Sequence, residues 1–401
     1  MTPARWWRLP CGGAALVALG CSTAPPPPAA APIPAAPAAP TTAAATAPPP
    51  PASAQGAPAA PAPAASSAPV APAAAAEPAD EVASSNGLAR GDGGPADQEL
   101  AQGDAAYDAE KYKEARAHYR RAEQLAPKDA APKVGLVRVS VAEADLPLDY
   151  ASAPRDPRIA SLLKQLDAAL KLDGDFGPAL LERGQLLLIQ GKAEQASSTL
   201  ERAAQLLPHH AEAQSAVGVA LVALGKAKES LPYFERAAAL ERDSPERLGN
   251  LGAAYLMQGR TPDAVRAFEK AAAIAPNDAR YQSDLGTAYL AANRLDRALP
   301  TLQRAVALDP QRATYAANLA YAFQQSGDLV RAVETAERAT QLDPKLGSAW
   351  LNLGTARAKR GELDQAEAAF KKAQALDPED PRVKANLEEL GELRRKKSAA
   401  P

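Results

Sequence analysis

Four polar side chains recur along this chain at intervals of 34 residues, and their chemistry suits contact with a peptide backbone. They are Asn250, Asp284, Asn318 and Asn352. An Asn amide can donate one hydrogen bond and accept another, as a backbone peptide group requires of its partner. A row of such groups is therefore a candidate site for an extended chain. The alternative is that each side chain forms hydrogen bonds locally within the protein.

Cys21 is a second residue with a candidate chemistry, the attachment of lipid. Residues 1–20 combine two arginines with a short apolar stretch, which is typical of a secretory signal peptide and too short to span a bilayer. The segment ends in Ala18-Leu19-Gly20-Cys21, which resembles the lipobox of bacterial lipoproteins, although Ala18 stands where that family usually has Leu. The resemblance implies cleavage before Cys21 and acylation of Cys21, which would anchor the chain stably in a membrane. Ordinary signal cleavage with a secreted product is the alternative.

Sequence patterns of catalysis and metal binding are missing. The sequence holds no phosphate loop, no nucleophile elbow and no helical pair of metal-binding histidines, and the adjacent His209 and His210 make a poor chelate. Both cysteines lie within the first 21 residues, which excludes a disulfide framework elsewhere. The net charge of −2 is unlike the basic excess of nucleic-acid-binding proteins. We therefore expect a protein that is not an enzyme, holds no cofactor or metal, and binds neither nucleic acid nor a small-molecule substrate.

Residues 21–95 form a region of biased composition. Positions 21–80 contain 18 Pro and 27 Ala, and such a segment cannot bury enough apolar surface to offset its chain entropy. We predict a disordered Ala/Pro-rich linker, in which about 60 residues of polyproline II could reach about 180 Å. The Arg90-Gly91-Asp92 triplet near its end looks like an integrin motif, and chance occurrence in a linker is the alternative.

The rest of the chain is repetitive, and the repeat explains how the polar residues above are positioned. Three columns recur with a period of 34: Gly184, Gly218, Gly252, Gly286 and Gly354; then Ala203, Ala237, Ala271, Ala305, Ala339 and Ala373; then Pro208, Pro276, Pro310, Pro344 and Pro378. Each unit carries two apolar stripes with helical spacing, a small residue at the close approach, and usually a Gly between the stripes. The Pro column stops the second helix. One unit is therefore a helix hairpin that must bury its faces against its neighbours.

At these residues the chain resembles the tetratricopeptide repeat. The last unit shows the family pattern most fully, in Trp350, Leu353, Gly354, Ala366, Phe370, Ala373 and Pro378. The resemblance implies an all-α fold, a right-handed α-solenoid of about eight hairpins. The units are 96–129, 130–176, 177–210, 211–244, 245–278, 279–312, 313–346 and 347–380, and a capping helix with a basic tail follows at 381–401. Unit 130–176 carries a 13-residue insert, residues 144–156, which is either a loop or a contact element.

The resemblance also implies a concave groove lined by the first helix of each hairpin. Peptide-binding candidates in it are Asn250, Arg280, Asp284, Asn318, Tyr321, Gln325, Asn352 and Lys359. Units 177–278 place apolar side chains there, including Leu181, Leu188 and Val219, which either contact a partner or pack internally. The Lys and Asn of the chaperone-binding carboxylate clamp are absent, so chaperone tails are not the expected ligand.

These expectations combine into a membrane-anchored scaffold of a bacterial cell envelope, which binds a protein or peptide partner in the groove. Ser22 after the cysteine favours the outer membrane, on either its periplasmic side or its surface. The alternatives are an assembly lipoprotein for type IV pilus or secretion machinery, and a non-catalytic adaptor of a cell-wall enzyme. The partner, the pathway, the orientation and the oligomeric state stay open at this point.

Overall fold

The computed structural model describes residues 87–144 and 156–399, which form seventeen helices, α2 to α18, and no strand. Eight helices open a hairpin: α2 (Pro95–Asp108), α4 (Ala131–Glu143), α6 (Gly177–Ile189), α8 (Ala211–Ala223), α10 (Pro245–Met257), α12 (Ala279–Ala291), α14 (Ala313–Gln325) and α16 (Gly347–Lys359). Eight close one: α3 (Tyr112–Leu125), α5 (Pro157–Leu172), α7 (Ala193–Leu206), α9 (Ala227–Leu240), α11 (Thr261–Ile274), α13 (Leu295–Leu308), α15 (Leu329–Leu342) and α17 (Leu363–Leu376). The last helix is α18 (Pro381–Ala399). The α-solenoid of helix hairpins is confirmed.

The Gly column sets how closely the two helices of a hairpin approach. A Cβ atom at Gly218 would lie 2.7 Å from the ring of Phe234 on α9, and one at Gly354 would lie 2.5 Å from the Phe370 ring on α17. Such distances are shorter than van der Waals contact, so only Gly lets the large side chain of the second helix reach the backbone of the first. Glycine therefore controls the depth of packing in these hairpins, whereas unit 313–346 has Ala320 at the same position.

Among the described residues, the turns inside seven hairpins each contain a left-handed residue, which is Glu110 (φ 60°) in the first hairpin. Gly225 and its counterparts have φ values of 71–82°, a region that glycine adopts without steric cost. Unit 279–312 lacks the glycine, and Asn293 adopts φ 57° in its place. Asn tolerates this region better than most residues because its short polar side chain can form local hydrogen bonds.

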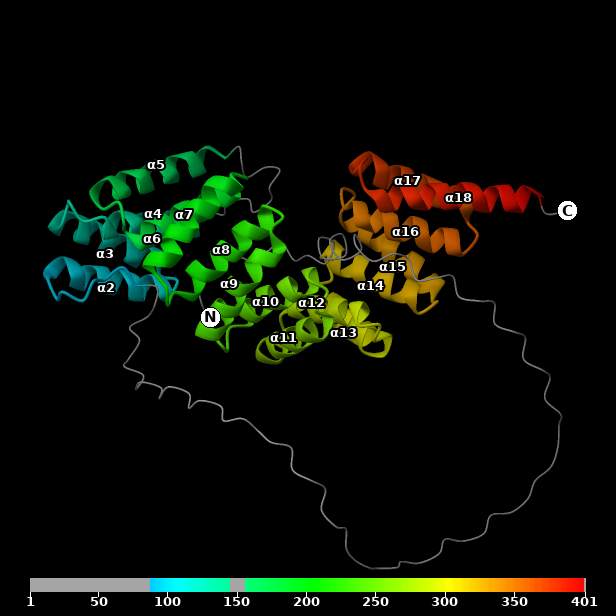
Figure 1. Cartoon of the computed structure of the whole chain (residues 1–401), viewed down its shortest axis with the longest axis horizontal. Coiled ribbons are helices and arrows are strands. Elements are labelled where there is room, and N and C mark those ends of the chain that lie inside the picture. The colour runs from blue at the N-terminus through cyan, green and yellow to red at the C-terminus, as the bar shows by residue number, and fades with distance from the viewer. Residues whose placement is uncertain (1–86, 145–155, 400–401) are drawn as a thin grey trace, which may run out of the picture. The chain divides into compact units, whose positions relative to one another are not determined.

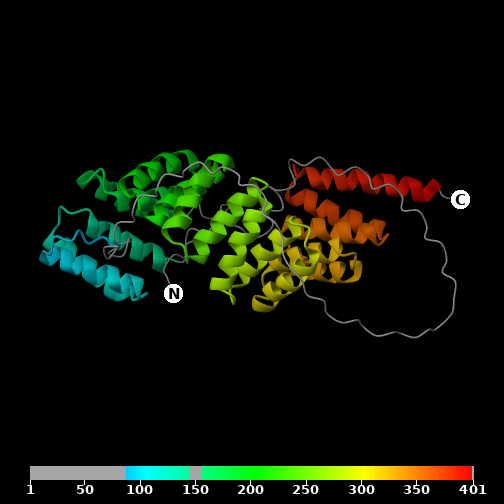
Figure 2. The same cartoon turned by 60° about the horizontal axis from the view of Figure 1, so that its bottom comes forward.

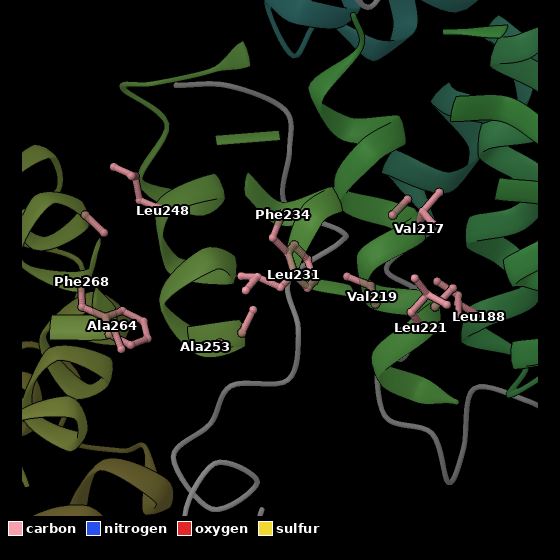
Figure 3. Packing of buried hydrophobic residues seen from close by; sticks show 14 of the residues in the cluster. Leu188, Val217, Val219, Leu221, Leu231, Phe234, Leu248, Ala253, Ala264 and Phe268 are labelled. Atoms are coloured by element: carbon pink, nitrogen blue, oxygen red, sulfur yellow. The ribbon is translucent and has the colours of Figure 1, made fainter. Parts of the chain in front are cut away.

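The core runs between the helices along the stack, without a break at the hairpin boundaries. One cluster of buried apolar side chains extends from Leu180 to Ala298, and another extends from Leu88 to Ile189. Figure 3 shows part of the first, with Leu231 and Phe234 of α9 near Ala253 of α10. Consecutive hairpins therefore share a core, as a repeat that cannot bury its faces alone requires.

Consecutive first helices lie against one another at every junction from α2 to α16, whereas consecutive second helices make at most marginal contact. The order of the hairpins can be followed in Figure 1 and, from another side, in Figure 2. Because the first helices are closer together than the second helices, each junction curves with its first helices on the inner side. We call the surface formed by the eight first helices the first-helix face.

Both ends of the stack are closed by local contacts. Residues 87–94, which the composition predicts as part of the linker, lie against the first hairpin: the Leu88 N–H donates to Asp104 (2.6 Å), and the Arg90 guanidinium donates to Asp129 (2.8 Å). The Arg-Gly-Asp triplet thus has a structural use. At the other end, Val383 and Leu390 of α18 are buried.

Some expectations fall outside the described residues. These are the signal peptide, Cys21, residues 21–86 of the linker, and residues 145–155 of the insert. Within the described ranges, no helix is both long and apolar enough to cross a membrane.

Candidate functional site

The eight candidate residues lie on four consecutive first helices. Asn250 is on α10, Arg280 and Asp284 are on α12, Asn318, Tyr321 and Gln325 are on α14, and Asn352 and Lys359 are on α16. Gln325 and Lys359 are exposed, Arg280, Tyr321 and Asn352 are partly exposed, and the other three are buried. The candidates therefore fall into an accessible set toward α16 and a buried set toward α10.

The asparagine row connects neighbouring first helices. The Asn250 Nδ2 donates to Ser215 Oγ on α8 (3.1 Å), and the Asn318 Nδ2 donates to Ser283 Oγ on α12 (3.2 Å). The Asn352 Nδ2 donates to the carbonyl oxygen of Ala317 (2.9 Å). The partner always lies 35 positions earlier. Each of the three amide nitrogens thus donates a hydrogen bond across a junction, so the amides connect neighbouring first helices as well as offering polar atoms to a ligand.

Asp284 occupies the same position in the row but has a different environment. The residue 35 positions before it is Gly249, which offers no hydroxyl group. The Oδ1 atom of Asp284 has no hydrogen-bond partner in the part of the chain that the structure describes, and the residue is only 4% exposed. Burial raises the pKa of the Asp284 carboxyl to about 7, although the nearby Arg280 guanidinium opposes the shift. The row therefore contains one buried acceptor that is not satisfied.

Arg280 lies one helical turn before Asp284, but its guanidinium interacts with Tyr281. Its guanidinium stacks 4.4 Å from the Tyr281 ring centroid and donates to the Tyr281 hydroxyl. Its Nε atom is buried without a hydrogen-bond partner among the described residues. Arg280 therefore moderates the charge of Asp284 through space.

The apolar candidates are used inside the fold. Leu181, Leu188 and Val219 are buried in the hydrophobic core. The structure therefore favours internal packing for these side chains over a surface for a partner.

Apart from Arg280 and Asp284, sequence reasoning missed a line of charged side chains on the first helices α2 to α12. Its members, which we call the charged stripe, are Asp104, Asp108, Arg138, Glu182, Glu212, Glu246, Arg247, Arg280 and Asp284. The Arg138 Nε donates to Glu182 (2.7 Å), joining α4 to α6, and the Arg247 guanidinium binds Glu212, joining α10 to α8. Several members share the 34-residue register: Glu212, Glu246 and Arg280 are 34 positions apart, and so are Asp104 and Arg138, but the sign of the charge changes within each set. The sequence signal that could have revealed these residues is the presence of charged side chains within first helices whose other positions are small or apolar.

Burial controls the electrostatics of this stripe. It raises the pKa values of Asp104, Asp108 and Glu182, although the Arg138 guanidinium opposes each of these shifts. The arginines remain charged, because the Glu212 carboxylate and its acidic neighbours hold the pKa of Arg247 above its usual value against the effect of burial. The stripe thus combines charged arginines with carboxyl groups whose ionisation is disfavoured.

The histidine pair has a structural position. The buried His210 accepts a hydrogen bond at Nδ1 from the Ala213 N–H (3.2 Å) and so caps α8. Burial lowers the pKa of His210 to about 4, and the Arg138 and Arg247 charges act in the same direction. The ring is therefore neutral at pH 7, as an accepting nitrogen requires. Among the described residues, no three His, Cys, Asp or Glu side chains are grouped so that they could hold a metal ion.

Comparison with protein families finds one repeat along the chain. Three family models, each for the tetratricopeptide repeat, match residues 209–277 and 248–311, residues 323–390, and residues 100–137 and 283–347. Together they span 100–137 and 209–390, which is more than half of the 401 residues. A comparison with curated proteins finds no match.

Solved structures share the fold at low sequence identity. The Cut9 and Hcn1 hetero-tetramer of the APC/C includes a chain that matches with a TM-score of 0.56 and 14% identity, over 73% of this chain. This chain spans 55% of that one. A thermophilic repeat protein of Thermus thermophilus covers 45% of this chain and 98% of its own (24% identity, TM-score 0.41). Pseudomonas aeruginosa pilF covers 53% of this chain and 97% of its own (20% identity, TM-score 0.45). The first likeness supports the fold, and the other two are too distant to support more.

Proposed function

The chain belongs to the tetratricopeptide repeat family, and on that premise we propose that it is a membrane-anchored scaffold that binds a protein partner through its first-helix face. The observation that supports this most is the continuous row of first helices, which lie against one another at every junction from α2 to α16. Because neighbouring hairpins share their cores, the surface is formed before any partner arrives. A preformed surface loses little conformational entropy on binding.

Tyr321, Gln325 and Lys359 are the accessible part of the proposed surface on α14 and α16. They supply an aromatic ring, an amide and a cation, which can contact an extended chain by packing, by hydrogen bonds and by charge. The buried Asn250 and Asn318 hold the junctions between the helices that carry this surface.

The proposed anchor is a lipid on Cys21, supported by the lipobox-like Ala18-Leu19-Gly20-Cys21. The Ala/Pro-rich linker would let the repeat region search the space near a membrane of the bacterial envelope, which raises the local concentration for a partner on the same membrane. The role is one of binding and requires no catalytic step.

A capture experiment tests the partner surface. The full chain is immobilised, proteins of an envelope extract are captured, and a captured protein is purified and its affinity measured. The variant Tyr321→Ala, Gln325→Ala, Lys359→Ala should lose at least about tenfold in affinity, since truncation of central contact residues costs more than about 1.4 kcal/mol. The control variant Tyr233→Ala, Gln303→Ala, Lys372→Ala removes the same residue types from second helices and should bind as the parent does. Equal affinity of both variants would overturn the assignment of the partner to the first-helix face.

A separate experiment tests the anchor. Metabolic labelling with palmitate should place label on the parent and none on Cys21→Ser, and the parent should fractionate with membranes. An unlabelled parent that is released from the cell would overturn the anchoring part of the proposal and leave the scaffold part standing.

A further inference from the structure

The charged stripe is not balanced in charge. It contains six carboxyl groups, on Asp104, Asp108, Glu182, Glu212, Glu246 and Asp284, against three guanidinium groups, on Arg138, Arg247 and Arg280. Three negative charges exceed the positive ones when all are ionised, and because burial raises the pKa of Asp284 to about 7 and also raises those of Asp104, Asp108 and Glu182, the excess is largest above pH 7. Neighbouring members interact electrostatically from α2 to α12, so the excess belongs to one connected row.

The stripe reaches solvent along part of its length. Asp108 is exposed, and the side chains of Glu182 and Glu212 are 16% and 14% exposed. Their arginine partners are more deeply buried, at 9% for Arg138 and 3% for Arg247. A visiting molecule would therefore meet carboxylate oxygens before it met the guanidinium groups.

Asp284 supplies an independent indication that a partner is expected. It is nine-tenths buried and its Oδ1 accepts no hydrogen bond within the described residues. The equivalent side chains Asn250 and Asn318 bond to Ser215 and Ser283, whereas the position facing Asp284 in this register is Gly249. A buried acceptor left without a donor costs free energy, and an ammonium or guanidinium group is its strongest partner.

This inference rests on the proposed function and specifies the chemistry of the partner. We propose that the charged stripe binds a peptide segment rich in Lys and Arg, and that Asp284 accepts a hydrogen bond from one of those side chains. Charge complementarity selects this occupant, because an acidic or neutral segment would leave the excess carboxylates uncompensated. Five steps between adjacent helices, each about 9 Å, make about 45 Å, which an extended segment of about 14 residues covers.

Fluorescence anisotropy with defined peptides tests the proposal. The probes are three labelled 14-residue Gly/Ser peptides that carry four Lys, four Glu or four Gln at the same positions. The protein is the full chain with Cys21→Ser, so that no lipid is attached. We expect the Lys peptide to bind at least about tenfold more tightly than the Gln peptide, the Glu peptide not to bind, and the affinity for the Lys peptide to fall as salt rises.

Two charge-matched variants show whether the stripe is responsible. Asp284→Asn should lower the affinity for the Lys peptide about tenfold, because it removes a charge-assisted hydrogen bond. Glu229→Gln removes the same charge from an exposed position on the second helix α9 and should change the affinity less than about twofold. Asn is the residue that three neighbouring units already carry at this position, so Asp284→Asn is expected to fold. Equal effects of the two variants, or equal affinity for all three peptides, would overturn the proposal.

The same experiment separates this inference from the proposed function. If the Lys peptide fails to bind while the partner from the envelope extract still depends on Tyr321, Gln325 and Lys359, the basic-segment inference is wrong and the scaffold stands. If the chain dimerises in sedimentation experiments and Arg394→Gln, Arg395→Gln disperses the dimer, the stripe binds the basic end of a second copy, and the separate partner is wrong.

Discussion

The first helices α2 to α12 and the first helices α14 and α16 share a repeat pattern but differ in the polar chemistry at their junctions. The first group holds the charged stripe, in which Arg138 and Arg247 bridge neighbouring helices through carboxylates, beside one neutral bond from Asn250 to Ser215. In the second group, neutral amides do the bridging, from Asn318 to a serine hydroxyl and from Asn352 to a carbonyl oxygen.

This difference shows that the repeat pattern does not fix which polar groups connect neighbouring first helices. The small residues and large apolar side chains of each hairpin already supply the packing. A charged junction carries a large desolvation cost that its partners must offset, whereas a neutral junction carries a small one. The charged region should therefore be more sensitive to substitution and to pH, while the neutral region should be tolerant of both.

The largest expected effect comes from Arg247, which is 3% exposed and pairs with Glu212, Glu241 and Glu246. Arg247→Met would leave buried carboxylates without their cation, and we expect it to lower the free energy of unfolding by about 5 kcal/mol. Urea denaturation followed by circular dichroism measures the change. Arg338→Met on the exposed surface of α15 is the control and should stay within about 0.5 kcal/mol of the parent. A similar decrease in the free energy of unfolding in both variants would show that the charged junction contributes no more to stability than an exposed arginine.

The second effect depends on pH and comes from Asp284. Its pKa is raised to about 7 when folded, so between about pH 4 and pH 7 the folded state holds a proton that the unfolded state has released. The stability that the protonated carboxyl supports is therefore complete below about pH 4 and is lost as the pH rises through 7. Asp284→Asn should stabilise the chain at pH 8 by about 4 kcal/mol, which is the value of about three pKa units, and hardly at all at pH 4.

Thermal unfolding of Asp284→Asn and the parent at both pH values measures this prediction. The difference between the two proteins isolates Asp284 from the other titrating groups, including Asp278 and Arg280, which act on its carboxyl. A stability difference that does not change between pH 4 and pH 8 would contradict the raised pKa.

The third effect belongs to the neutral region. Asn318→Ala removes hydrogen bonds to Ser283 and Thr287, and we expect a loss of about 1 to 2 kcal/mol. Because no charge changes, the loss should be the same at pH 5 and pH 8, in contrast to Asp284→Asn. Parallel urea titrations at the two pH values check this. A loss that varies with pH would remove the distinction between the two regions.

The smallest expected effect is on the pKa of Asp284, and it comes from a substitution that gives the α10–α12 junction the serine found at the α8–α10 and α12–α14 junctions. Gly249→Ser would place a hydroxyl where Ser215 and Ser283 bond to the asparagines, and a hydrogen bond to the charged form should lower the pKa of Asp284 by about one unit. The new Cβ would lie 3.2 Å from the Tyr281 ring, so the ring must shift slightly. Carbon NMR of the Asp284 carboxyl follows the titration. An unchanged pKa would show that the missing hydroxyl does not explain the unsatisfied oxygen.

The hairpins could be predicted from the sequence because their determinants are local and repeated. Gly, Ala and Pro columns mark the close contact, the packing and the end of each second helix, and the eight hairpins follow from them. Residues 87–94 could not be predicted, because they are held by the carboxylates of Asp97 and Asp104 on the following helix. Their composition resembles a linker, and only tertiary hydrogen bonds order them.

The sequence predicted where the candidate residues lie on the helices, but it did not predict which groups they form hydrogen bonds with. The 34-residue spacing put Asn250, Asp284 and Asn318 on equivalent positions of first helices, and the structure places them there. What each side chain bonds to depends on the residue 35 positions earlier, and that residue is Ser, Gly and Ser in the three cases. The charge of the stripe changes sign along the 34-residue register, from Glu212 and Glu246 to Arg280, so the ion pairs that connect its members are evident only in the assembled junctions.

Hydrogen–deuterium exchange of the full chain, with and without the purified partner, tests the central claim most directly. Amide protection reports local stability segment by segment, so it separates first helices from second helices within the same hairpin. The account predicts that the partner slows exchange in α10, α12, α14 and α16 and leaves α9, α11, α13 and α15 unchanged. Protection confined to the second helices would contradict the assignment of partner binding to the first-helix face.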